Sequence, residues 1–347
     1  LAGNLMIRDA VVDFIEKEGI DYYKQFIREA IEEGRRIVLK RVKERLIPGR
    51  YRAASFFDVP FKNEAWQPKA KVDKVTNEPI EVIVDKDGGL SIDFEGSSGP
   101  GPNPMNCGKG AMEGGQWVLL TQILIYGDKV NDGAYFAVNK NYPLGTWCNP
   151  GDPYLSYQSP WGNLIPAYTG MMKCLSFGLF SRGYREEVVP GYGFTGDAIQ
   201  GGGIYSSGPL KGDRWALSTF EISGQGLGAS AVRDGLDWGY AMWNPESDLG
   251  DVETWELFQG GVPYLSRKVK PNTAGHGKYR GGANYAGVAM IANSEDVDFF
   301  GAREGMVFHG SGGMHGGYPH GTGYRLIAKN TNFKEIIDNQ EEYPLGD

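Results

Sequence analysis

The first 46 residues carry a helical repeat of apolar positions. Over residues 21–46, apolar side chains recur at spacings of three, four and seven, and Glu and Arg fill the opposite face. The apolar positions are Tyr23, Phe26, Ile27, Ala30, Ile31, Val38, Val42 and Leu46. This pattern predicts an amphipathic helix that has Asp21 as its N-cap and is ended by Pro48. A shorter helix over residues 5–18 is predicted to precede it. We expect the apolar stripe to be buried against the rest of the chain or against a partner.

After residue 48 the pattern changes to short apolar runs. Residues 80–84 and 90–94 alternate around a turn at residues 85–89, which predicts a β-hairpin. Residues 116–126 are apolar nearly all round, which fits either a buried helix or a central strand, and we favour the helix. A second buried helix is predicted within residues 160–180, beginning after Pro166. Further strands are predicted at residues 215–222, 252–258, 267–270, 285–291 and 297–301.

Together these elements predict an α+β fold with extensive antiparallel sheet, an N-terminal amphipathic helical hairpin and buried central helices. No repeat with a period of 20 to 50 residues is visible, which argues against a propeller or a solenoid. Composition suggests three regions: a helical and hairpin region (1–100), a glycine-rich central α+β region (101–250) and a C-terminal β-rich region (251–347).

Composition narrows the class of protein. The formal net charge is −8, with 43 acidic and 35 basic residues, which argues against binding nucleic-acid phosphates. No apolar run is long enough to span a membrane and the start lacks a secretory signal, so we expect a cytoplasmic protein. The 52 glycines cluster at residues 108–115, 191–203, 224–228 and 310–323, which indicates tight turns and backbones in close approach.

Few residues suggest chemistry by themselves. The three cysteines lie far apart, without a CxxC pair, so we expect buried reduced thiols. All four histidines fall in the last quarter of the chain, three of them within residues 308–321. Such a cluster could bind a metal or a carboxylate, but no Asp or Glu lies between its members. A structural or exposed role competes with a catalytic or substrate-lining role for His309 and His315.

Ordered segments along nearly the whole chain resemble the large, hydantoinase-B-like subunits of ketone carboxylases of the acetone carboxylase type. They are residues 6–61, LSIDFEGSS (90–98), VNDGA (130–134), LGTWCNPGD (144–152), FSRGYREEV (180–188), QGGG (200–203), residues 231–257, HGKYRGGANY (276–285), GGYPHGTGYR (316–325) and YPLG (343–346). The wider superfamily includes the B subunits of hydantoinases and 5-oxoprolinases. The chain looks like the central portion of such a subunit.

The resemblance implies an ATP-dependent ligase that carboxylates a ketone with bicarbonate, forming acetoacetate if the ketone is acetone. It implies a hetero-oligomer in which a hydantoinase-A-like partner handles ATP and Mg²⁺ and a small third subunit completes the assembly. The sequence has no Walker loop, since residues 108–110 (GKG) lack the GxxxxGK[ST] frame and are interpreted as a turn. Manganese is implied for the complete subunit, but its ligands in relatives lie in segments upstream of this chain, so we assign no metal ligand here.

Several residues are candidates for the carboxylation chemistry. Asp197 and Glu221 are isolated acids in apolar or glycine-rich sequence, suited to removing a proton from the carbon beside a ketone. Arg233, Lys278 and Arg280 are candidates for holding a carboxylate or a phosphorylated intermediate, although surface ion pairs are the alternative. Asn131-Asp132-Gly133 is interpreted as a turn.

Two other functions remain open from the sequence. One is a B-type subunit of an ATP-dependent hydantoinase, oxoprolinase or lactamase, or of an aryl ketone carboxylase. The other is a non-catalytic structural fragment that docks on the ATPase subunit. Activity toward acetone, acetophenone and cyclic amides separates these possibilities.

Overall fold

The fold is taken from a computed structural model of the chain. It describes residues 2–59, 62, 71–103, 105–128, 130–152, 154–155, 161–189, 191, 199–219, 226–237, 256, 262–301, 309–310, 312–323 and 326–341. Within these residues, no helix is both long enough and apolar enough to cross a membrane.

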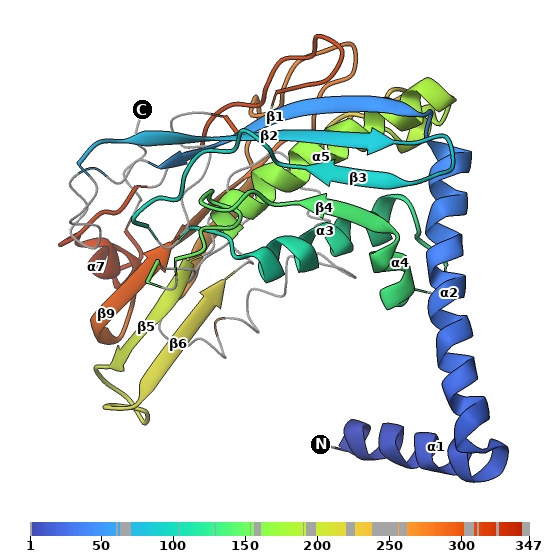
Figure 1. The fold of residues 1–347 in the computed structure, drawn as a ribbon. Coiled ribbons are helices and arrows are strands. Elements are labelled where there is room, and N and C mark those ends of the chain that lie inside the picture. The colour runs from blue at the N-terminus through green and yellow to red at the C-terminus, as the bar shows by residue number, and fades with distance from the viewer. Residues whose placement is uncertain are drawn as a thin grey trace.

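Two helices form an arm that projects from the body of the molecule (Figure 1). They are α1 (Ala2–Glu18) and α2 (Ile20–Arg45), joined at Gly19, which has a φ of 90° and is the N-cap of α2. The prediction that Asp21 is the N-cap was wrong. Asp21 lies inside the first turn of α2, where its negative charge interacts favourably with the helix dipole.

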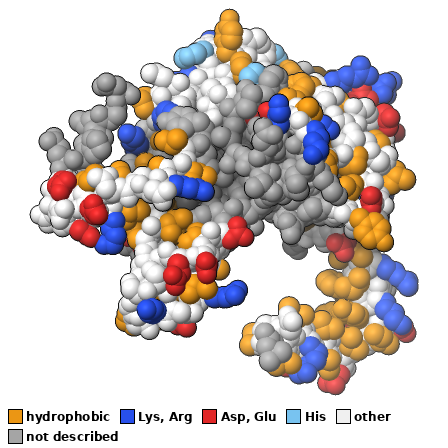
Figure 2. Space-filling model, turned by 90° about the vertical axis from the view of Figure 1, so that its left-hand side faces the viewer, with side chains coloured by type: hydrophobic (Ala, Val, Ile, Leu, Met, Phe, Trp, Pro, Cys, Tyr) orange, Lys and Arg blue, Asp and Glu red, His pale blue; other side chains and the backbone are white. Residues whose placement is uncertain are grey.

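Burial divides α2 into two halves. Its buried residues are Gly34, Val38, Val42 and Arg45, whereas α1 has none. Phe26 is 50% exposed, and other large apolar side chains of the arm are also exposed: Leu5, Met6, Ile7, Val12, Ile20, Tyr22, Ile27 and Ile31 (Figure 2). The expected burial of the stripe is therefore confirmed within the chain only for the C-terminal half of α2. Burial of the other half against a partner stays a prediction.

A four-stranded sheet covers one side of the body. Its strands are β1 (Gly49–Val59), β2 (Lys74–Val84), β3 (Leu90–Asp93) and β4 (Val138–Asn141), in the order β1-β2-β3-β4. The predicted hairpin is confirmed, because β2 and β3 pair antiparallel with Val82 opposite Ile92. β4 runs parallel to β3.

The main core lies between this sheet and three helices, α3 (Lys109–Ile123), α4 (Asp132–Phe136) and α5 (Trp161–Arg182) (Figure 1). α5 packs against β1 and β2. At their contact, a Cβ on Gly170 would lie 2.2 Å from Cδ1 of Ile80, so glycine permits the close approach. The predicted helix over residues 116–126 is confirmed by α3.

Three local predictions were wrong. Residues 108–110 open α3, with Gly108 as its N-cap, and are not a turn. Residues 131–133 begin α4, where Asn131 caps the helix by accepting a hydrogen bond from Gly133 N at 2.9 Å. α5 begins at Trp161 and contains Pro166, although the sequence predicted a start after this proline.

The remaining strands form two smaller sheets. β5 (Ile199–Tyr205) pairs antiparallel with both β6 (Arg214–Thr219) and β9 (Ser294–Gly301), and β7 (Tyr264–Val269) pairs with β8 (Tyr285–Ala289). A 3₁₀ turn, η1 (Arg185–Glu187), follows α5, and α7 (Phe333–Asp338) lies near the end of the chain. Of the predicted late strands, only the one over residues 252–258 lies almost wholly outside the described residues.

These elements confirm the predicted α+β class. The three-region division stays a prediction, although two sheets take strands from both sides of its boundaries: β4 pairs with β3, and β9 pairs with β5.

Candidate functional site

A cavity of about 450 Å³ lies where three glycine-rich segments meet the end of α5. The segments contribute residues 226–231, 275–279, 281–282, 312–318 and 320, and Phe180, Val188 and Gly191 line the side next to α5. This volume falls in the range of sites for small molecules.

Close backbone approach explains why glycine is needed around this cavity. A Cβ on Gly226 would lie 1.9 Å from the carbonyl oxygen of Gly282, and one on Gly282 would lie 1.7 Å from that of Leu236. Backbone hydrogen bonds join the same segments, from Gly282 N to Leu227 O at 2.8 Å and from Tyr318 N to His276 O at 2.8 Å. The glycine clusters therefore allow segments far apart in sequence to form one wall.

The charge of the lining favours an anion. Arg185 and Lys278 line the cavity together with three imidazoles, those of His276, His315 and His320, and the described lining contains no Asp or Glu. Cations near a cavity without carboxylates attract anionic groups such as a carboxylate or a phosphate.

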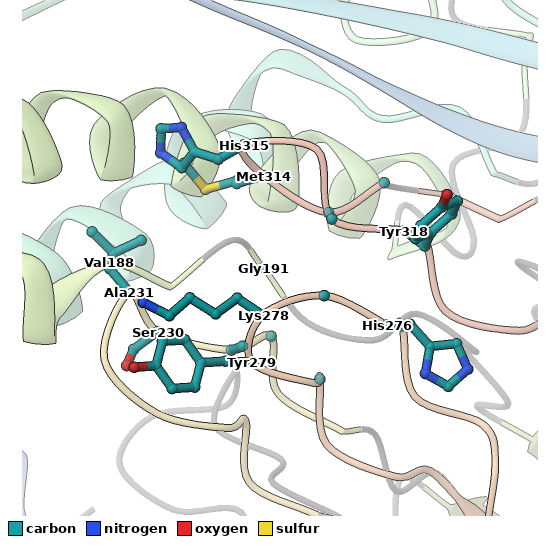
Figure 3. A pocket seen from close by; sticks show the side chains of 18 of the residues that line it. Val188, Gly191, Ser230, Ala231, His276, Lys278, Tyr279, Met314, His315 and Tyr318 are labelled. Carbon is teal, nitrogen blue, oxygen red and sulfur yellow. The ribbon is translucent and has the colours of Figure 1, made fainter.

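Lys278 and Tyr279 come from the loop between β7 and β8. Figure 3 shows Lys278 extending toward Ala231 and Val188, while the ring of Tyr279 lies beside Ser230. Lys278 Nζ lies 5.3 Å from the centre of the Tyr279 ring. The exposed ammonium of Lys278 can thus reach a ligand without leaving its aromatic neighbour.

His315 is held against the C-terminal part of α5. Its ring lies 4.7 Å from that of Phe180 and 5.3 Å from that of Phe177, measured between ring centres. Its φ of 51° places the backbone in the left-handed region, where residues other than glycine are uncommon, and Gly316 follows with a φ of 87°. The loop therefore turns sharply at His315 and presents this ring to both α5 and the cavity.

His320 also lines the cavity and is half-buried. Burial lowers the pKa of its imidazole, and the neighbouring His309 and the positive charge of Lys173 lower it further. A neutral ring is therefore favoured. His309 itself does not line the cavity and is half-buried, and the next residue, Gly310, accepts a hydrogen bond from Phe56 N of β1 at 2.9 Å.

The other predicted site residues lie elsewhere. Arg233 is exposed in a turn where its backbone N and O bond Ser230. The Arg280 guanidinium lies 2.6 Å from Asp237 and 3.7 Å from Asp234, and this contact lowers the pKa of Asp237. Asp197 and Glu221 fall outside the described residues. Of the seven predicted site residues, the structure thus brings Lys278 and His315 to one cavity, and the roles of all seven stay predictions.

The residues of the cavity do not fit a divalent metal. No three His, Cys, Asp or Glu side chains converge on a metal position among the described residues. Manganese prefers oxygen ligands, whereas the described lining offers imidazoles beside two cations. The cysteines are not candidates, because Cys107, Cys148 and Cys174 are buried and burial raises their pKa values.

The sequence did not single out Arg185, Ser230, Tyr279 or His320 as site residues. Arg185 and Ser230 lie in segments whose sequence has no recognisable spacing for chemistry, and only the fold brings them together. His320 shares the glycine-rich segment of His315, and that shared segment was the available signal.

Comparison with known families gives one match over nearly the whole chain. The family described as Hydantoinase B/oxoprolinase matches residues 1–346.

Two solved structures are similar to this one. Nucleotide-free acetone carboxylase superposes with a TM-score of 0.89 and 39% identity over 100% of this chain and 45% of that chain. The ATP-dependent caprolactamase of Pseudomonas jessenii has a TM-score of 0.55 and 16% identity, over 81% of this chain and 47% of that chain, a likeness of fold alone.

Two curated relatives show similar sequences. The chain is 40% identical to the acetone carboxylase alpha subunit of Xanthobacter autotrophicus, over 100% of this chain and 44% of that protein. It is 21% identical to the acetophenone carboxylase delta subunit of Aromatoleum aromaticum, over 95% of this chain and 46% of that protein. The chain therefore spans somewhat less than half the length of the relatives it matches.

Proposed function

The chain belongs to the Hydantoinase B/oxoprolinase family, and we propose that it forms part of the large subunit of an ATP-dependent ketone carboxylase. The reaction joins a ketone and bicarbonate into a 3-oxo acid, with acetone giving acetoacetate. The observation that carries this proposal is the likeness to acetone carboxylase over 100% of the chain, at 39% identity and a TM-score of 0.89.

The cavity is the proposed place of the anionic reactant or product in this chain. Bicarbonate, its activated form and the 3-oxo acid product each carry a negative charge. Lys278 and Arg185 attract that charge, and Lys278 holds the carboxylate at the mouth of the cavity. The charge and size of the lining support this assignment.

ATP use is proposed for the assembled enzyme rather than for this chain. A hydantoinase-A-like subunit would bind ATP with Mg²⁺, and a small third subunit would complete the hetero-oligomer. The relatives are named as subunits, alpha and delta, which supports an assembly of several chains. The manganese of the complete enzyme is not assigned to this chain, since no group of metal-binding side chains lies among its described residues.

The test is ATP-dependent fixation of labelled bicarbonate by the assembled complex. Acetone, acetophenone and a cyclic amide are offered separately, and acetone is expected to be the preferred substrate. Lys278→Met is expected to lower kcat/KM at least tenfold, because about 1.4 kcal/mol of charge stabilisation corresponds to a factor of ten. Lys211→Met is the matched control, since Lys211 is an exposed lysine in the turn between β5 and β6.

Other outcomes decide between the alternatives. Hydrolysis of the cyclic amide without bicarbonate fixation would place the chain with the ATP-dependent amide hydrolases. Unchanged carboxylation in Lys278→Met would remove the proposed role of the cavity. If variants along the whole lining altered assembly but never turnover, the chain would be a structural component that docks on the ATPase subunit.

A further inference from the structure

α5 contains one buried lysine that the proposed function leaves unexplained. Lys173 carries an amine, yet it is only 6% exposed and lies in an otherwise apolar stretch of the helix. Its Nζ has no hydrogen-bond or ion-pair partner among the residues that the structure describes. Burial lowers the pKa of this amine to about 8, so most molecules still carry the ammonium charge at neutral pH.

Lys173 lies on the face of α5 that supports the cavity. Residues spaced by three, four or seven positions share one face of a helix, and here Thr169, Ser176, Phe177 and Phe180 flank Lys173 in this way. Each flanking residue contacts a segment that forms the cavity wall.

One turn before Lys173, a Cβ on Gly191 would lie 2.3 Å from Cγ2 of Thr169. One turn after it, Ser176 Oγ accepts a hydrogen bond from Val189 N at 3.1 Å and donates one to Val189 O at 2.9 Å. Next along the same face come the ring contacts of Phe177 and Phe180 with His315. Since Gly191, Phe180 and His315 line the cavity, the face of α5 that carries Lys173 packs behind the cavity wall, and Lys173 itself is not one of the lining residues.

Two further observations point from Lys173 toward the cavity. The positive charge of Lys173 contributes to the lowered pKa of the His320 imidazole, and His320 lines the cavity. Thr169, on the same face, is 0% exposed, and its Oγ1 has no hydrogen-bond partner. The Thr169 hydroxyl, unpaired among the described residues, therefore lies one helical turn from the largely buried amine of Lys173.

An unpaired ammonium and an unpaired hydroxyl are each costly in a protein interior, and an anion would satisfy both. We propose that Lys173 and Thr169 form a buried subsite for a small oxyanion at the inner end of the cavity. Bicarbonate, a substrate carboxylate and a phosphoryl group share this chemistry. The inference deepens the proposed function and rests on it only for the identity of the anion.

The test measures oxyanion binding by the assembled complex without turnover. Thermal denaturation is followed at constant ionic strength in chloride, then with increasing bicarbonate, acetate or inorganic phosphate, for wild type, Lys173→Met and the control Lys211→Met. An anion that binds only the folded state stabilises it by RT ln(1 + [L]/Kd), so Tm rises with the concentration of the anion. We expect wild type and Lys211→Met to respond, and Lys173→Met to lose the response or to need at least tenfold more anion.

The variant is expected to fold, because methionine is unbranched, only one atom shorter than lysine, and carries no charge that must be desolvated. Lys173→Met should therefore start from an equal or higher Tm in chloride. Thr169→Val keeps the shape of the side chain and is expected to weaken anion binding to a smaller extent. The anion with the largest response identifies the source: bicarbonate or acetate indicates a carboxylate subsite, and phosphate indicates a phosphoryl subsite.

Two results would overturn the subsite. Equal anion responses in wild type and Lys173→Met would place the bound anion elsewhere, and a large fall in Tm in chloride would mean that Lys173 has a structural partner. Carboxylation assays separate this inference from the proposed function. If the complex fixes no bicarbonate but its anion response still depends on Lys173, the subsite is supported and the proposed carboxylase function is not. If Lys173→Met carboxylates with an unchanged KM for bicarbonate and keeps the anion response, only the subsite is refuted.

Discussion

The exposed half of α2 and the buried residue that caps its C-terminal end should respond differently to the loss of a large apolar side chain. Leu46, directly after the helix, is 0% exposed, and its Cδ2 lies 2.8 Å from the position that a Cβ on Gly178 of α5 would take. Leu46→Ala leaves a cavity in this tight contact, and such substitutions cost about 3 to 5 kcal/mol. We expect the free energy of unfolding to fall by that amount.

Phe26 lies in the exposed half of the same helix. Half of its surface is already in water, and its aromatic neighbour is Phe14 of α1, at 5.8 Å between ring centres. Full burial of such a side chain contributes about 1.5 to 3 kcal/mol, so the half-buried ring is expected to contribute about 1 kcal/mol. Phe26→Ala should therefore cost much less than Leu46→Ala.

Urea unfolding of the chain measures both changes, with Lys40→Ala as the control. Lys40 is exposed and its ion pair with Glu44 spans 3.8 Å, so its loss should cost less than about 0.5 kcal/mol. An equal loss of stability in Phe26→Ala and Leu46→Ala would refute the division of α2 into exposed and buried halves. In the assembled complex, Phe26→Ala is expected to weaken subunit association, because exposed aromatic side chains on a projecting arm suit an interface.

Two further predictions concern the cavity wall and the buried lysine. Gly282→Ala should lower the free energy of unfolding, measured in urea, by more than about 2 kcal/mol, since its Cβ would lie 1.7 Å from Leu236 O. Gly114→Ala in α3 has open space around its Cβ and should raise the free energy of unfolding by about 0.5 to 1 kcal/mol. The pKa of Lys173 is lowered from 10.5 to about 8, so the folded protein loses this proton at a lower pH than the unfolded chain does. The free energy of unfolding of the wild type should therefore rise between pH 8 and 10.5, by up to about 3 kcal/mol, and Lys173→Met should lack this rise; matching pH profiles would contradict the burial of the ammonium.

Local patterns predicted the elements whose neighbours in sequence are also their neighbours in space. The hairpin of β2 and β3 follows from alternation on both sides of a short turn, and the register pairs Val84 with Leu90 and Val82 with Ile92. The arm follows from the 3.6-residue period. The same period identifies which face of α2 is apolar but not what covers that face, so it could not separate the buried half from the exposed half.

Contacts between distant segments account for the local errors. At residues 131–133, Asn131 Nδ2 donates to Ala30 O at 2.7 Å, and a Cβ on Gly133 would lie 1.6 Å from Ile31 O. Docking on α2 therefore selects a short helix where turn chemistry alone favoured a turn. Burial similarly extends α5 to the N-terminal side of Pro166, because packing of residues 162–165 in the core outweighs the hydrogen bond that the proline cannot donate.

The candidate anion subsite illustrates what a sequence pattern leaves undetermined. Lys173 is the single charged residue between positions 161 and 181, so the sequence does carry a signal. However, a lone lysine in an apolar helix usually extends its aliphatic stem and keeps its ammonium in water. Whether it can do so here depends on the segments around residues 191 and 309–320, which lie far along the chain and cover this face of α5. Without those segments Lys173 would be an ordinary surface group. With them its amine is largely buried, and in that case a bound anion compensates the charge.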